Sequence, residues 1–173
     1  MNCEDMVKIP ELENVLLLRA GVGGMKNIVR WIYFADCLQC VQSEYKVEDY
    51  IHGGEFVILT NRSVTDNKDT LIGLIGKMLA HGISALGINE GQISDELIQY
   101  ADENDLSLFE LPEKYPLIDL SQILCNKLVL EETIKIWRNS FYFNSGFRTF
   151  KQRKHFSTDT ILKCGPFRRV LCG

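Results

Sequence analysis

The chain has 173 residues, of which 46% are apolar and 24% are charged, and its formal net charge is -4. It contains no apolar run of about 18 residues, and its first residues, MNCED, lack the positive region and apolar core of a signal peptide, which argues against membrane-spanning and secreted proteins. We therefore expect a cytoplasmic protein with no membrane partner, large enough for one self-supporting domain.

The charged side chains are distributed unevenly along the chain. Residues 1–124 carry 9 basic and 20 acidic side chains, whereas residues 125–173 carry 10 basic and 3 acidic ones. Periodicity fades in the second part, so we predict a folded domain over residues 1–124 and a basic, aperiodic tail over residues 125–173 that is partly helical or disordered. An acidic domain repels phosphate backbones, and the tail has no helix-turn-helix pattern, so we do not expect this chain alone to bind nucleic acid.

The first part of the chain predicts a short helix and two strands. Residues 3–13 have apolar side chains at helical spacing, but Pro10 limits the helix to one or two turns. Residues 15–18 and 28–34 are apolar runs rich in strand formers, and the sequence AGVGG at residues 20–24 separates them. We expect these two strands to meet across this glycine-rich turn.

The middle of the chain alternates strands with helices. Residues 50–61 join a Gly-Gly turn to an apolar run that is typical of a buried strand in a parallel sheet. Residues 66–82 predict an amphipathic helix, residues 84–88 a strand, residues 94–104 a second helix and residues 106–111 a last strand, after which residues 117–137 have helical periodicity. This alternation predicts an α/β fold of three layers, with a mostly parallel sheet of about five strands and helices on both faces.

Two features suggest a chemical site but lack the residues that it requires. The turn at residues 21–24 follows a strand, as a dinucleotide-binding loop does, but Lys26 replaces the third glycine of that motif. Cys37 and Cys40 have the spacing of a redox pair or of half a zinc site, yet only His52 lies nearby in the sequence. No nucleophile occurs with a base and an acid in a recognisable setting, so we expect a protein that is not an enzyme and holds no metal or cofactor.

A ligand site is the more specific hypothesis. Arg30 and Trp31 combine a cation with a large aromatic face, and Glu55 and Thr60 belong to the neighbouring predicted strand. Such groups bind flat polar heterocycles by stacking and hydrogen bonding, and we expect them to converge at the carboxyl ends of the strands. The alternative interpretation is that Trp31 is a core residue and Arg30 its solvated neighbour. The predicted ligand-binding residues are Arg30, Trp31, His52, Glu55, Thr60 and Asn61.

Several segments follow one another in the order found in a known group of regulators. They are IPEL at residues 9–12, VRWI at 29–32, YIHGGEFVILT at 50–60, HGISALGI at 81–88, LSLFELP at 106–112 and PLIDL at 116–120. Over about residues 3–124 the series resembles the N-terminal domain of the PucR family, the purine catabolism regulators of bacteria. The resemblance implies a sensory or regulatory α/β domain placed ahead of a C-terminal helix-turn-helix, and it implies no enzymatic activity.

The chain departs from this family in two places. Residues 37–47 form a longer loop than is usual there, and the chain ends at Gly173, before the expected DNA-binding region. A truncated or frameshifted form of a longer regulator would explain the second departure.

The sequence therefore predicts the signal-input domain of a PucR-like transcription factor without its helix-turn-helix. We expect it to bind a small purine-related metabolite or a partner domain, and to form a homo-oligomer. Two alternatives remain open. One is a protein-protein interaction module that acts by self-association, and the other is a metal or redox domain built on Cys37 and Cys40.

Overall fold

Five strands form one sheet in the computed structural model, which describes residues 1–35 and 46–148. The strands are β1 (Leu17–Ala20), β2 (Trp31–Phe34), β3 (Glu55–Leu59), β4 (Ala85–Asn89) and β5 (Ser107–Leu111), and their order is β1-β5-β4-β3-β2. Strands β2 to β5 are parallel to one another, and β1 pairs with β5 in the antiparallel direction. The chain divides into two units, Met1–Ile134 and Lys135–Gly173, and the sheet belongs to the first.

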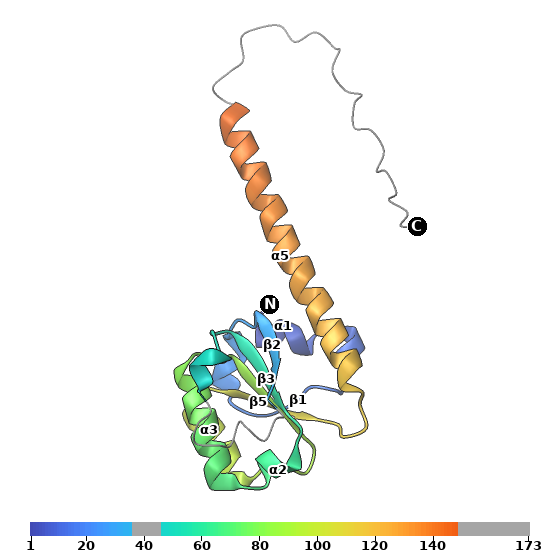
Figure 1. Cartoon of the computed structure of the whole chain (residues 1–173). Helices are drawn as coiled ribbons and strands as arrows, with labels where there is room; N and C mark the ends of the chain where they lie inside the picture. Colours follow the sequence, from blue (N-terminus) through green and yellow to red (C-terminus); the bar gives the residue numbers. More distant parts are fainter. Residues whose placement is uncertain (36–45, 149–173) are drawn as a thin grey trace, which may run out of the picture. The chain divides into compact units, whose positions relative to one another are not determined.

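The sheet and its helices confirm the predicted α/β fold with a mostly parallel sheet (Figure 1). The helices are α1 (Cys3–Val7), α2 (Arg62–Thr65), α3 (Lys68–Ala80), α4 (Asp95–Glu103) and α5 (Leu117–Arg148). Short 3-10 helices are η1 (Pro10–Leu12), η2 (Val22–Lys26) and η4 (Val47–Asp49). Among the described residues, none of the helices is long and apolar enough to cross a membrane.

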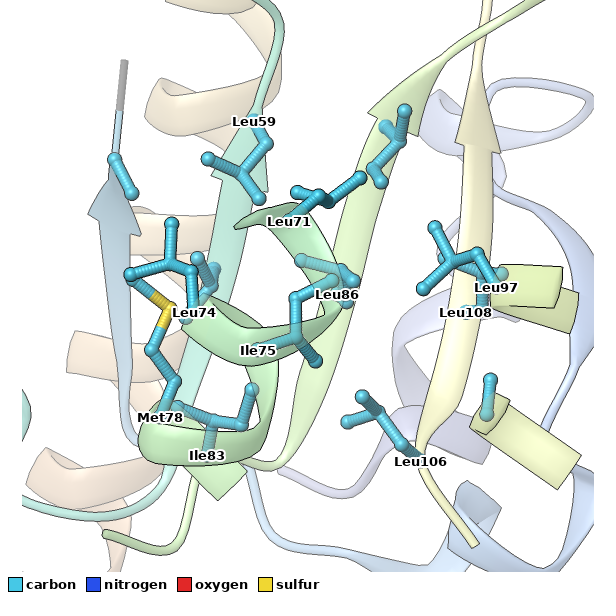
Figure 2. Close-up of a cluster of buried hydrophobic side chains, with 14 of the residues drawn as sticks. Leu59, Leu71, Leu74, Ile75, Met78, Ile83, Leu86, Leu97, Leu106 and Leu108 are labelled. Carbon is cyan, nitrogen blue, oxygen red and sulfur yellow. The ribbon is translucent and has the colours of Figure 1, made fainter. Parts of the chain in front are cut away.

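One face of the sheet packs against α3 and α4. Val57 and Leu59 of β3 point to this face, and Figure 2 shows Leu59 beside residues of α3 such as Leu71 and Ile75. Strands β3, β4 and β5 follow one another both in the sequence and in the sheet, so their right-handed crossover connections place α3 and α4 on the same side. Leu97 of α4 completes this layer.

The opposite face packs against the N-terminal segment and the start of α5. Phe56 and Ile58 alternate with Val57 and Leu59 along β3, because successive side chains of a strand point to opposite faces. The ring of Phe56 meets that of Phe109 edge to face at a centroid distance of 5.9 Å. The other buried members of this layer include Met6, Leu12, Leu120, Leu124 and Leu128.

The caps of the two central helices follow from the sequence. The side chain of Asn67 accepts a hydrogen bond from the Thr70 amide at 3.2 Å, and that of Ser94 accepts one from the Leu97 amide at 3.3 Å. Helix α3 ends at Ala80 with His81 as its C-cap, and Gly82 follows with a φ of 85°. The predicted helices at residues 66–82 and 94–104 are therefore confirmed, and each has a side-chain cap that binds one unpaired amide of its first turn.

One expectation about the start of the sheet is wrong. The strands on either side of the glycine-rich turn do not meet, because β1 and β2 lie at opposite edges of the sheet. The segment between them contains η2, and Gly21, the residue before η2, donates its amide hydrogen to Asp102 Oδ1 at 2.6 Å. The turn is thus held against the end of α4 and the start of β5, and the chain crosses the sheet before β2 begins.

Helix α5 is longer than predicted. It runs from Leu117 to Arg148, whereas helical periodicity is evident in the sequence only over residues 117–137. The predicted boundary after residue 124 falls within this helix and stays a prediction. The remainder of the predicted tail, residues 149–173, lies outside the described residues.

Candidate functional site

The predicted ligand-binding residues lie at both ends of β3 and do not converge at its carboxyl end. Trp31 is the register partner of Glu55, so the two begin neighbouring strands at the amino end of the sheet. Thr60 and Asn61 follow the last residue of β3. At a rise of about 3.3 Å per residue, the length of β3 separates the two groups by roughly 16 Å. Because β2 and β3 are parallel, the residues that precede the two strands lie side by side at the amino end of the sheet.

At the amino end, the carboxylate of Glu55 is buried and bound by the chain itself. Its side chain is 3% exposed, and its two oxygens accept hydrogen bonds from the amides of His52 at 2.8 Å and Gly53 at 3.0 Å. Gly53 and Gly54 have φ angles of 96° and 90°, which side chains rarely adopt. The Gly-Gly-Glu sequence therefore forms a turn directly before β3, in which two backbone amides bind the buried carboxylate of Glu55.

The same turn joins the segments that precede β2 and β4. The carbonyl of Gly54 accepts a hydrogen bond from the Arg30 amide at 2.7 Å, and the amide of Gly54 donates to the carbonyl of Gly82 at 2.8 Å. The carbonyl of Glu55 accepts a bond from the Ser84 amide at 2.8 Å. A Cβ atom on Gly54 would lie 3.1 Å from both Cγ and Cδ of Arg30, so the Arg30 side chain passes closely over the glycine.

Two of the aromatic residues of β2, Trp31 and Phe34, are exposed, whereas Tyr33 is half-buried. Trp31 is 63% exposed, so the alternative interpretation of this residue as part of the core is wrong. Phe34 at the end of β2 and Tyr50 before β3 are exposed too, and the ring of Tyr50 stacks on that of Tyr33 at a centroid distance of 6.2 Å. Arg30 and His52 are also exposed, so the amino ends of β2 and β3 present Arg30, Trp31 and His52 to solvent.

At the carboxyl end, polar side chains of the loops after β3 and β4 meet. Asn61 caps α2 by accepting a hydrogen bond from the Ser63 amide at 3.0 Å. The hydroxyl of Thr65, which is buried, donates to Gln92 Oε1 at 2.7 Å and lies 3.4 Å from the Asn61 carbonyl. Gln92 was not predicted to belong to a site, and its position in the loop after a predicted strand was the signal available in the sequence.

The strand order bears on where a ligand could bind. In open parallel sheets, ligands bind in the crevice where the order of strands reverses. Here the parallel strands lie in sequence order, so this part of the described sheet has no reversal. A ligand at the carboxyl end would consequently contact the loops after β3 and β4, because the crevice that forms at a reversal of strand order is missing from these parallel strands.

The glycine-rich turn after β1 is required by close packing. Gly21 has a φ of 71°, and a Cβ atom there would lie 1.8 Å from the carbonyl oxygen of Leu106. A Cβ atom on Gly24 would lie 2.2 Å from the carbonyl oxygen of Asp105. Because they have no side chain, these glycines allow the segment that contains η2 to contact the backbone just before β5. We therefore assign the turn a structural role and not a role in ligand binding.

Of the described cysteines, Cys125 is exposed and Cys3 is buried and unreactive. Burial of Cys3 raises the pKa of its thiol from 9.0 to about 11, so the thiol is protonated and weakly nucleophilic at neutral pH. Within residues 1–35 and 46–148, no group of three or more His, Cys, Asp or Glu side chains is placed to hold a metal ion. The predicted metal or redox pair, Cys37 and Cys40, lies outside the described residues.

Comparison with known proteins shows what the chain is similar to. Residues 5–128 match the model of the purine catabolism regulatory protein-like family. The purine catabolism regulatory protein of Bacillus subtilis (strain 168) is 31% identical over 124 residues, which cover 69% of this chain and 22% of that protein.

Proposed function

Because the chain belongs to the purine catabolism regulatory protein-like family, we propose that it is the signal-input module of a transcription regulator that responds to purine breakdown. The extent of the family match carries this proposal. Residues 5–128 run from α1 to Leu128 of α5, and so include the whole sheet and both helical layers. The chain spans 22% of the length of its Bacillus relative, and we assign DNA binding to the part of such a regulator outside this module.

The signal we propose is a small purine-derived metabolite bound at the carboxyl end of the sheet. Thr60, Asn61 and Gln92 are half-buried there and carry hydroxyl and amide groups. Purine breakdown products present several N–H donors and carbonyl acceptors in one plane, which such groups can bind.

Thermal unfolding with xanthine, urate and allantoin tests this proposal. A metabolite that binds only the folded state at about 100 times its Kd stabilises that state by about 2.7 kcal/mol, which corresponds to a rise in midpoint of about 5–10 °C. We expect Gln92→Ala to abolish the rise and Arg30→Ala, at the other end of β3, to retain it. Each variant is compared with its own midpoint in the absence of metabolite.

The two variants also define the contrary results. A rise that Arg30→Ala removes and Gln92→Ala leaves intact would move the binding site to the amino end. No rise with any of the three metabolites, at concentrations up to their solubility, would contradict metabolite input.

One observation supports a second candidate, a partner domain as the source of the signal. The exposed aromatic residues Trp31 and Phe34 lie on β2, which is an edge strand of the sheet. Exposed tryptophan is characteristic of protein contact sites. In that case Trp31→Ala would weaken binding of the remaining domains of the regulator, whereas the metabolites would leave the midpoint unchanged.

A further inference from the structure

Apolar side chains change from buried to exposed along α5. Leu120, Leu124 and Leu128 pack against the sheet, but Leu130, Ile134 and Trp137 are all exposed. These three residues are spaced by four and then three positions, which places them on one face of a helix. We call this set, Leu130, Ile134 and Trp137, the α5 seam. Its spacing is that of the core positions of a coiled coil.

We propose that the α5 seam pairs with the same seam of a second copy of this chain, with the two helices antiparallel. Helices shorter than about 12–15 residues are marginal in water, and longer ones in proteins are stabilised mostly by burial of an apolar face. The exposed seam lacks such burial, and a second seam would supply it. In the paired helices, Ile134 lies against Trp137 of the second copy, and the reverse contact follows from the two-fold symmetry.

The charges beside the α5 seam are complementary to those of a second α5 helix, and they favour antiparallel pairing of the two helices. Glu131 follows Leu130 and Arg138 follows Trp137, so these charges occupy equivalent positions seven residues apart. When two copies run antiparallel, these positions face each other, and Glu131 meets Arg138 of the second copy twice. In a parallel pair they would face the positions of Asn126 and Thr133, which carry no charge.

Glu131 is held in place before pairing. Its Oε2 atom lies 2.7 Å from the α-amino group of Met1. A carboxylate can accept several hydrogen bonds, so Oε1 can bind the guanidinium of a second copy while Oε2 keeps this contact. Fixing one partner beforehand lowers the entropy cost of association.

Sedimentation equilibrium of the full chain tests this interface. The seam is short, so we expect a dimer with a dissociation constant in the micromolar range. Leu130→Asp and Trp137→Asp should each weaken it by at least about tenfold, because each buries a charge in the seam. The matched controls are Val129→Asp and Ile136→Asp, which alter neighbouring residues that are exposed on another face of α5 and should leave the dissociation constant unchanged. Circular dichroism confirms that every variant is folded.

A charge exchange tests the direction of the helices. Arg138→Glu places two like charges together at each contact and should weaken the dimer, as should Glu131→Arg. Mixing these two variants should restore association as a heterodimer, because each contact then joins opposite charges. Association that is insensitive to all of these charges would overturn the antiparallel arrangement.

A monomeric wild-type chain at about 100 μM, or equal effects of the seam and control substitutions, would overturn the proposal. The inference is independent of the proposed function. A monomer that still responds to a metabolite would leave signal input intact, and a dimer without a metabolite response would leave the α5 seam intact.

Discussion

Replacement of Glu55 by alanine is expected to lower the free energy of unfolding by about 3 kcal/mol. The carboxylate is buried and accepts the amide hydrogens of His52 and Gly53, and alanine offers no acceptor in its place. Two amide donors of the turn would lose the acceptor that holds them, and the positive φ angles of Gly53 and Gly54 would lose the interaction that fixes them. Urea denaturation followed by circular dichroism measures the difference.

Two further substitutions separate this effect from a general loss of charge. Glu55→Gln keeps one acceptor oxygen and a similar shape, so its effect should be smaller than that of alanine. Glu90→Ala removes an exposed carboxylate after β4 and should change the stability by less than about 0.5 kcal/mol. An equal effect of Glu55→Ala and Glu90→Ala would contradict the structural role of Glu55. The expected instability also makes substitutions of Glu55 poor probes of ligand binding.

Replacement of Gly21 by alanine is expected to destabilise the protein by more than about 4 kcal/mol or to prevent folding. The left-handed conformation at φ 71° costs a side chain about 1–2 kcal/mol. The larger part comes from the new Cβ atom, which would lie 1.8 Å from the Leu106 carbonyl oxygen and would force η2 away from the start of β5. Thermal unfolding measures the loss, and absence of a cooperative transition is its extreme form.

Gly91 provides the matched control for Gly21. Its φ is 74°, nearly the same, but a Cβ atom there has nothing within 4 Å. Gly91→Ala should therefore cost only the conformational part, about 1–2 kcal/mol. Similar losses for the two variants would show that close packing does not explain the glycine at position 21. Asp102→Ala, which removes only the hydrogen bond to the Gly21 amide, should cost about 1.5 kcal/mol.

The elements could be predicted wherever local signals agreed. The apolar run of β3 and the periodicity of α3 are each visible within a few residues, and Asn67 and Gly82 mark the ends of that helix. The candidate site was predicted less well. Arg30, Trp31 and Glu55 are indeed neighbours, but Thr60 and Asn61 lie at the other end of β3, and the sequence had suggested one site.

Two other departures have the same physical origin. A strand followed by a glycine-rich turn and a second strand is locally typical of a hairpin, yet β1 pairs with β5, about ninety residues further along the chain. Gly21 and Gly24 are required by close contact with the backbone of Leu106 and Asp105, which are equally remote in the sequence. Neither contact leaves a periodic pattern that a single sequence could reveal.

By itself, the sequence determined which segments become strands and helices, and hence a three-layer α/β fold. Burial gives the apolar residues of a helix a different spacing from those of a strand, and this spacing can be read in the sequence. Its ordered segments also determined the family. Only the tertiary structure decided that Glu55 is an internal anion, that Trp31 is exposed at a sheet edge, and that the predicted site residues are divided between two ends of β3. These properties depend on strand order and register, which arise from contacts between residues far apart in the chain.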